Sequence, residues 1–103
     1  MRAVDMIVKM IEDQGITQTE AARICGMSRQ NLWDKLNNGN MKFRSMYRIL
    51  TSFGFNLEIV PNTGAGQIPD QETFIAVAEK ENLPYDSLER ILEAIGYRIN
   101  IYQ

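Results

Sequence analysis

The chain has 103 residues, a formal net charge of −2 and an apolar content of 45%, which suits one small domain or one domain with an appendage. It contains no histidine and one cysteine, which excludes a histidine-based metal site, a Cys–His nucleophile and an intrachain disulfide. A single thiol without a signal peptide indicates a cytoplasmic protein, and no apolar run approaches the ~20 residues that span a bilayer.

The net charge hides an asymmetry between the two ends of the chain. Residues 1–60 hold eight Lys and Arg against six Asp and Glu, whereas residues 61–103 hold three against seven. Between Arg23 and Arg48 six basic residues face a single acidic one, Asp34. Because binding to nucleic acid depends on the local field, an acidic overall composition does not exclude a DNA-binding surface in the first half.

Residues 2–14 predict a first helix, and Gly15 is placed to end it. Charged residues occupy the face opposite the apolar stripe, as in a helix that covers a core. The stripe consists of Val4, Ile7, Val8 and Ile11.

Residues 17–39 predict two short helices joined by a tight turn. Thr17 is positioned to cap the first helix, with Glu20 three residues further on as in a capping box. Gly26 suits the left-handed conformation that ends a helix, and Ser28 follows as the cap of the second helix. The residues expected to face inward are Ala21, Ala22 and Cys25 in the first helix and Leu32 and Leu36 in the second.

Residues 43–60 predict a further helix followed by a strand. Gly54 ends the helix, and residues 55–60 alternate apolar and polar side chains as a half-buried strand does. Residues 61–69 contain Pro and Gly and are typical of a linker. The apolar stripe of the helix consists of Phe43, Met46, Tyr47, Leu50 and Phe53.

Residues 70–103 predict two more helices and a second strand. Asp70 is a candidate N-cap for a helix over residues 71–81, and Pro84 suits the first turn of the next helix. Residues 97–102 alternate as a second strand. The residues expected to face inward are Phe74, Val77 and Ala78 in the first of these helices and Leu88, Ile91, Leu92 and Ile95 in the second.

An internal echo links residues 43–60 with residues 85–102. At an offset of 42 the two segments share six identical residues, and each reads as a helix, a glycine and a strand. A repeat of this kind predicts a small two-stranded sheet, formed within or between chains; two unrelated amphipathic helices with glycine ends are the alternative. Glu58 is expected to lie opposite Arg98. The residues expected on the other face of the sheet are Leu57, Ile59, Ile99 and Ile101.

A characteristic spacing connects five residues of the segment described above: Gln18, Ala22, Gly26, Ser28 and Leu32. With this spacing the chain resembles the lambda-repressor-like (Cro/Xre-type) helix-turn-helix proteins, and in particular small phage and bacterial repressors. The resemblance covers residues 1–60 and implies a mainly α fold with a four-helix DNA-binding domain. A linker at 61–69 and a helix-helix-strand extension at 70–103, which serves dimerisation or interaction, complete the expected domain organisation.

The resemblance implies that the helix capped by Ser28 reads the major groove with its N-terminal end. Arg can grip guanine bidentately and Gln can do the same to adenine, each pair discriminating by ~1–3 kcal/mol. Each member of the set has an alternative. Arg29 and Gln30 can be solvated residues at the helix start, and Arg29 can contact a phosphate instead. The alternatives for the others are packing at the helix edge for Trp33, a place on the helix flank for Asn31, and repulsion of Asp34 by phosphate. The complete set of expected base-reading residues is Arg29, Gln30, Asn31, Trp33 and Asp34.

The same resemblance implies a set of phosphate contacts. Gln18 opens a helix, where free N–H groups and the helix dipole favour an anion, and in the family it also braces the first reading residue, here Arg29. Each cation in the set can instead be an ordinary solvated charge. The expected phosphate contacts are Gln18, Ser28, Asn37, Asn38, Lys42 and Arg44.

These features predict a sequence-specific DNA-binding transcriptional regulator, most simply a repressor of phage, mobile-element or toxin–antitoxin type, with no enzymatic activity and no cofactor. Some relatives dimerise by exchanging C-terminal strands, which implies a homodimer on double-stranded DNA. The alternative is a protein-interaction module, such as an antitoxin, whose residues 70–103 bind a partner protein such as a toxin. The residues expected to form the dimer are Phe55, Leu57, Ile59, Tyr97, Ile99 and Ile101.

Overall fold

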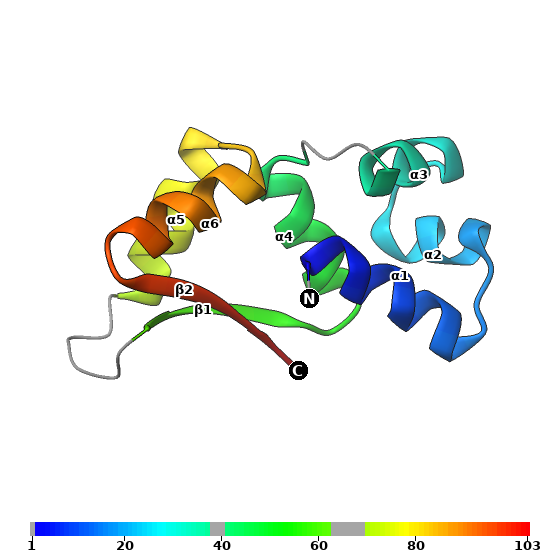
Figure 1. Ribbon diagram of the computed structural model, residues 1–103. Helices are drawn as coiled ribbons and strands as arrows, with labels where there is room; N and C mark the ends of the chain where they lie inside the picture. Colours follow the sequence, from blue (N-terminus) through cyan, green and yellow to red (C-terminus); the bar gives the residue numbers. More distant parts are fainter. Residues whose placement is uncertain (1, 38–40, 63–69) are drawn as a thin grey trace. The chain divides into compact units, whose positions relative to one another are not determined.

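A computed structural model describes residues 2–37, 41–62 and 70–103 and shows a mainly helical chain with a small antiparallel sheet (Figure 1). The mainly α class predicted from the sequence is therefore confirmed. The chain divides into two compact units, Met1–Gly39 and Asn40–Gln103. No helix in the described ranges has the length and apolar character needed to cross a membrane. The elements in these ranges are α1 (Ala3–Gln14), α2 (Gln18–Cys25), α3 (Arg29–Asn37), α4 (Phe43–Ser52), β1 (Asn56–Pro61), α5 (Gln71–Glu81), α6 (Tyr85–Ala94) and β2 (Tyr97–Tyr102).

The first unit contains α1, α2 and α3. Thr17 caps α2 as predicted, because its hydroxyl accepts a hydrogen bond of 3.1 Å from the N–H of Glu20. The carboxylate of Glu20 pairs with Arg23 and is not seen to bond back to Thr17 as a complete capping box would require. Gly26 ends α2 in the left-handed region at φ 70°. The buried apolar side chains of this unit are Ala3, Ile7, Met10, Ala21, Ala22, Cys25, Leu32 and Leu36.

In the second unit, β1 and β2 lie side by side as an antiparallel pair within one chain (Figure 1). The prediction that Glu58 faces Arg98 is wrong, because Arg98 lies opposite Val60 and Glu58 lies opposite Asn100. Asn100 Nδ2 donates a hydrogen bond of 2.9 Å to Glu58 Oε1, so the pair is joined across the sheet. The apolar pairs agree with the prediction: Leu57 with Ile101, and Ile59 with Ile99.

A pseudo-two-fold relation connects the two halves of this unit. The N–H of Phe43 donates to the C=O of Leu83, and the N–H of Tyr85 donates to the C=O of Met41, each at 2.8 Å. Met41 and Leu83 are 42 residues apart, as are Phe43 and Tyr85, so each of these two hydrogen bonds is the counterpart of the other. Glu58 and Asn100 are separated by the same number of residues. The Phe43 and Tyr85 rings stack with centroids 6.5 Å apart and an angle of 8° between their planes. Equivalent residues therefore meet at two places, at the Phe43–Tyr85 contact and at the Glu58–Asn100 pair of the sheet.

The repeat reaches further back than the sequence echo indicated. α3 and α5 begin 42 residues apart, at Arg29 and Gln71. Their N-caps are equally spaced: Ser28 accepts from the N–H of Asn31 at 3.1 Å, and Asp70 accepts from the N–H of Glu72 at 3.1 Å. Both copies therefore consist of a capped helix, a second helix and a strand.

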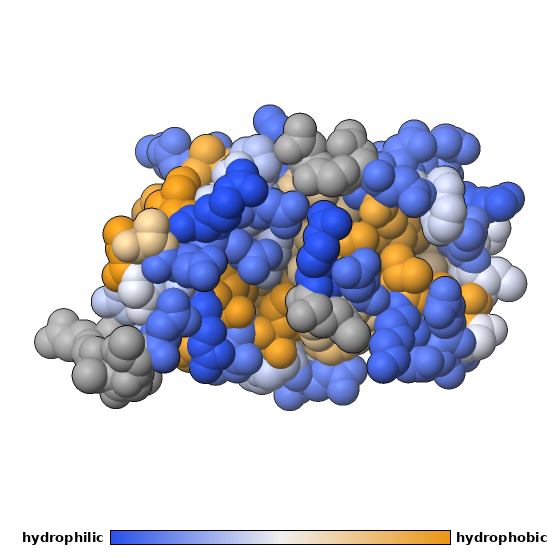
Figure 2. Space-filling view, in the orientation of Figure 1, coloured by the Kyte–Doolittle hydropathy of each residue, from blue (hydrophilic) through white to orange (hydrophobic). Residues whose placement is uncertain are grey.

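Three residues predicted to face inward are exposed instead. Val77 of α5 and Ile91 and Ile95 of α6 have exposed fractions of 54%, 50% and 64%. Figure 2 shows apolar side chains at the surface over the part of the molecule that α5 and α6 form. A two-stranded sheet is narrow and can cover only one side of a helix. The wide apolar stripes of α5 and α6 are therefore partly left in solvent. The buried positions of α6 are Tyr85, Leu88 and Leu92.

Candidate nucleic-acid interface

The N-terminal end of α3 is exposed to solvent. The hydroxyl of Ser28 accepts a hydrogen bond from the N–H of Asn31, which confirms Ser28 as the N-cap. The first backbone N–H groups of a helix have no intrahelical acceptor and carry the positive end of the dipole. Because Arg29 and Gln30 occupy the first two helical positions and are both exposed, their side chains stand beside these donors.

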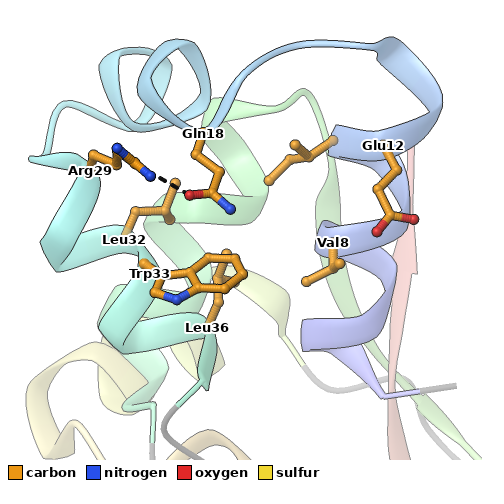
Figure 3. Close-up of a pocket in the computed structure, with 8 residues that line it drawn as sticks. Val8, Glu12, Gln18, Arg29, Leu32, Trp33 and Leu36 are labelled. Atoms are coloured by element: carbon orange, nitrogen blue, oxygen red, sulfur yellow. Dashed lines mark hydrogen bonds between the residues drawn. The ribbon is translucent and has the colours of Figure 1, made fainter.

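Arg29 is held by a side chain from the start of the preceding helix. Arg29 Nε donates a hydrogen bond of 3.3 Å to Gln18 Oε1 (Figure 3). The two terminal guanidinium nitrogens, which an arginine uses in a bidentate contact, have no partner among the described residues. The bond therefore orients Arg29 and leaves its two terminal nitrogens available.

Gln30 is oriented by Asp34, one helical turn further on. Gln30 Nε2 donates a hydrogen bond of 2.8 Å to Asp34 Oδ1, and both residues are exposed. One amide hydrogen and the amide oxygen of Gln30 remain for an outside partner. Asp34 thus positions a neighbouring polar group, and its negative charge is set back by one turn from the start of the helix.

An open concavity brings four predicted contact residues together. It is lined by Gln18, Arg29, Gln30 and Trp33. Trp33 is 43% exposed and is therefore no core residue. Asn37 donates its side-chain N–H to the carbonyl of Trp33 at 2.9 Å, which occupies one of its two amide hydrogens. Asn31 is also exposed, so every predicted base-reading residue stands at the surface of α3.

The first turns of α3 carry one cation, Arg29, and one anion, Asp34. The neighbouring cation, Arg23 of α2, forms an ion pair with Glu20. Hydrogen bonding to the guanidinium holds the pKa of the Glu20 carboxyl below its ordinary value, and the pKa of Arg23 is raised in return. This pair largely neutralises itself, whereas Arg29 has no carboxylate partner in the described parts of the chain.

The other predicted phosphate contacts have different surroundings. Lys42 is exposed and, like Arg44, belongs to the second unit. The guanidinium of Arg44 donates a hydrogen bond of 2.6 Å to the backbone C=O of Glu79, which ties α4 to α5. Sequence reasoning missed this role, since the two residues are distant along the chain. Asn38 lies outside the described residues.

The residues predicted to form a dimer meet within one chain. Leu57 and Ile59 are buried and lie opposite residues of β2, while Phe55 precedes β1 and Tyr97 is the first residue of β2. Within the single chain of this structure the two strands pair with each other.

Gln71 of α5 is a structural residue that sequence reasoning did not single out. Its Oε1 accepts from the N–H of Ile59 at 2.7 Å and its Nε2 donates to the C=O of Ile59 at 3.0 Å. These bonds close part of the outer edge of β1. Since backbone groups of antiparallel strands alternate in direction, those of Ile99 and Ile101 also face away from the partner strand. Among the described residues nothing bonds to them.

Comparison with known proteins adds no assignment. The chain matches no protein-family model, no curated protein and no solved structure at a significant level. Within the described ranges, no group of three or more His, Cys, Asp or Glu side chains lies close enough to hold a metal ion. The feature that bears most directly on function is therefore the polar face at the start of α3, formed by Gln18, Arg29, Gln30 and Trp33.

Proposed function

We propose that the chain is a sequence-specific DNA-binding transcriptional regulator of the lambda-repressor-like helix-turn-helix type, most simply a repressor. The observation that carries the proposal is the hydrogen bond between Gln18 and Arg29. It joins the first residues of two successive helices at one exposed face, which is the brace that the sequence resemblance implies. The same face presents Gln30 and Trp33.

In the proposed complex, the N-terminal end of α3 enters the major groove. Arg29 donates to guanine O6 and N7 with its terminal nitrogens, and Gln30 contacts adenine through its remaining amide groups. The free N–H groups at the start of α2, beside Gln18, receive a phosphate, so that backbone contacts set the register and α3 reads the bases.

The experiment is selection of bound sites from a random DNA pool, followed by anisotropy titrations of the selected site and of random DNA. The expected result is a palindrome with half-sites about one helical turn, ~34 Å, apart. Arg29→Ala should lose the difference between selected and random DNA, while Lys9→Ala, an exposed cation of α1 outside the site, should retain it. Failure to enrich any site would overturn the proposal.

We further propose that two chains associate through the outer edge of β2. A reader of palindromic DNA needs two copies, and each chain presents one α3. The outward backbone groups of Ile99 and Ile101 can pair with the same strand of a second chain, giving one continuous four-stranded sheet. On the β1 side Gln71 already occupies the backbone groups of Ile59.

A protein-interaction module is a second candidate, supported by an exposed apolar surface on α5 and α6. Ile91 and Ile95 are at least half exposed, and a cavity of about 90 Å³ lies near Val77 and Leu83. A partner bound at this surface, such as a toxin, would be released by the double variant Ile91→Lys, Ile95→Lys, with DNA affinity unchanged. A partner that copurifies equally well with the double variant would remove this candidate.

A further inference from the structure

An apolar cavity of about 110 Å³ lies in the first unit, between α1 and α3 (Figure 3). Its walls are aliphatic: Val8 and Ile11 come from α1, and Leu32 and Leu36 come from α3. The cavity is distinct from the polar concavity at the start of α3, although Gln18, Arg29 and Trp33 contribute to both. One small ring is about the largest apolar group that this volume can take, because an engineered apolar cavity of about 150 Å³ holds a single benzene.

Polar groups lie at two separate places on the wall. Arg29 and Gln18 form one group, joined by their hydrogen bond, and Glu12 lies apart from them on α1 (Figure 3). The bond engages only Nε of Arg29, so the two terminal nitrogens can meet a further acceptor. A carboxylate is such an acceptor, since its paired oxygens match the guanidinium fork.

We propose that this cavity binds a small aromatic monocarboxylate of benzoate size. The ring packs between the aliphatic walls and beside the indole of Trp33, where ring–ring contact adds to the burial. The carboxylate pairs with Arg29. Glu12 repels an anion at its side of the cavity, so the two charged residues together fix the direction in which the ligand enters.

Ligand binding should oppose DNA binding, and this consequence rests on the proposed function. Arg29 cannot direct its terminal nitrogens to a ligand carboxylate and to a guanine at the same time. The affinity for the selected site should therefore fall as the ligand saturates, and by linkage DNA should weaken the ligand to the same degree. The cavity would thus act as an effector site for the regulator.

The direct test needs no DNA. Trp33 is the only tryptophan in the chain and lines the cavity, so its fluorescence reports on binding. The full chain is titrated with benzoate, with benzene as the neutral probe and benzylamine as the cationic one. Benzoate should give a saturable change with an affinity about tenfold tighter than that of benzene, because a charge-assisted pair is added. Absence of saturation with benzoate, or tighter binding of benzylamine, would overturn the proposal.

Two variants and a control sharpen the result. Arg29→Gln, at an exposed position, should reduce the affinity for benzoate to that for benzene. Ile11→Phe should fill the cavity and abolish both, whereas Ile24→Phe, on the exposed side of α2 and not part of the cavity, should bind as the wild type does. Unchanged benzoate binding in Arg29→Gln, measured on a chain with native circular dichroism, would contradict the proposed site.

A second titration separates this inference from the proposed function. If benzoate binds as described and no DNA site is enriched, the ligand site stands and the regulator proposal fails. If a DNA site is enriched and its affinity is unchanged at saturating benzoate, the effector role is overturned.

Discussion

The side-chain amide of Gln71 bonds to both the N–H and the C=O of Ile59, so a helix residue takes the place of a third strand at one position of β1. Replacing Gln71 by Ala leaves two half-buried backbone groups without partners. We expect a loss of about 1–3 kcal/mol in the free energy of unfolding, measured by urea denaturation. Gln103→Ala, at the exposed chain end, is the control and should change little. Equal stability of the two variants would show that water replaces the amide without cost.

Arg29 and Lys42 should differ in the kind of DNA binding they support. Arg29→Ala removes the proposed guanine contact and should reduce affinity for the selected site by about 1–3 kcal/mol with little effect on random DNA. Lys42→Ala should weaken both DNAs alike, since a phosphate contact carries no sequence information. Anisotropy titrations at one fixed salt concentration measure both. An equal loss on the two DNAs for Arg29→Ala would remove this residue from the base-reading set.

The dependence of the DNA affinity on salt concentration reports how many phosphate contacts the protein makes. With six contacts in the dimer, the logarithm of the association constant should fall with the logarithm of salt concentration with a slope of about −5. Lys42→Ala removes one contact per chain and should make the slope shallower by about two in a dimer. Titrations between low and physiological salt give the slope. A slope near zero would be incompatible with a phosphate clamp.

The outer edge of β2 should control the oligomeric state. Ile101→Pro removes an N–H that faces away from β1 and should leave the β1–β2 pairing intact while preventing a second chain from pairing. Sedimentation at high micromolar concentration should show a dimer for the wild type and a monomer for the variant, both with a native thermal transition. A wild-type chain that stays monomeric at this concentration would refute the proposed interface.

Asp70 makes α5 sensitive to acid. The hydroxyl of Thr73 donates to Asp70 Oδ2 at 2.8 Å, and the N–H groups of Thr73 and Glu72 donate to Oδ1. These bonds hold the pKa of the Asp70 carboxyl below its ordinary value, so the folded state binds this proton less readily than the unfolded state does. The stabilisation is present above the unfolded pKa of about 3.9 and is lost as the pH falls through the lower folded pKa.

The matched variant for this prediction is Asp70→Asn, which can still cap α5 but does not titrate. The difference in melting temperature between wild type and Asp70→Asn should be constant from neutral pH down to about pH 5 and should shrink below about pH 4. Thermal melts followed by circular dichroism at several pH values measure it. A difference independent of pH would mean that another carboxyl controls acid stability.

Helix ends were predictable because they depend on neighbouring residues. The sequence predicts Thr17, Ser28 and Asp70 as caps, and each accepts a backbone N–H hydrogen bond, since a short polar side chain two or three residues before a free N–H can satisfy it alone. Gly26, at φ 70°, ends α2 for a similarly local reason. The exposed position of Arg29 follows from the same signals.

The sequence was less informative about which side chains pair with one another across the fold. Alternation correctly placed Leu57 and Ile59 on the inner face of a strand, but alternation repeats every two residues and leaves the register open. The choice of Arg98 as the neighbour of Glu58 followed charge, whereas the register follows the pseudo-two-fold relation that brings Asn100 there. Arg44 and Glu79 likewise meet only because α4 packs against α5.

Composition, capping residues and periodicity alone located every helix and strand named above to within one or two residues, because these signals act over three or four residues. The end of β1 is one difference, since the strand runs from Asn56 to Pro61 and includes a residue that the sequence analysis assigned to the linker. The tertiary structure alone decided which apolar faces stay in solvent, which edge of the sheet is closed and that Arg44 bonds to the backbone of Glu79. Those outcomes depend on contacts between segments that are far apart in the chain. No short stretch of sequence encodes such a contact, because it forms only when the helices pack.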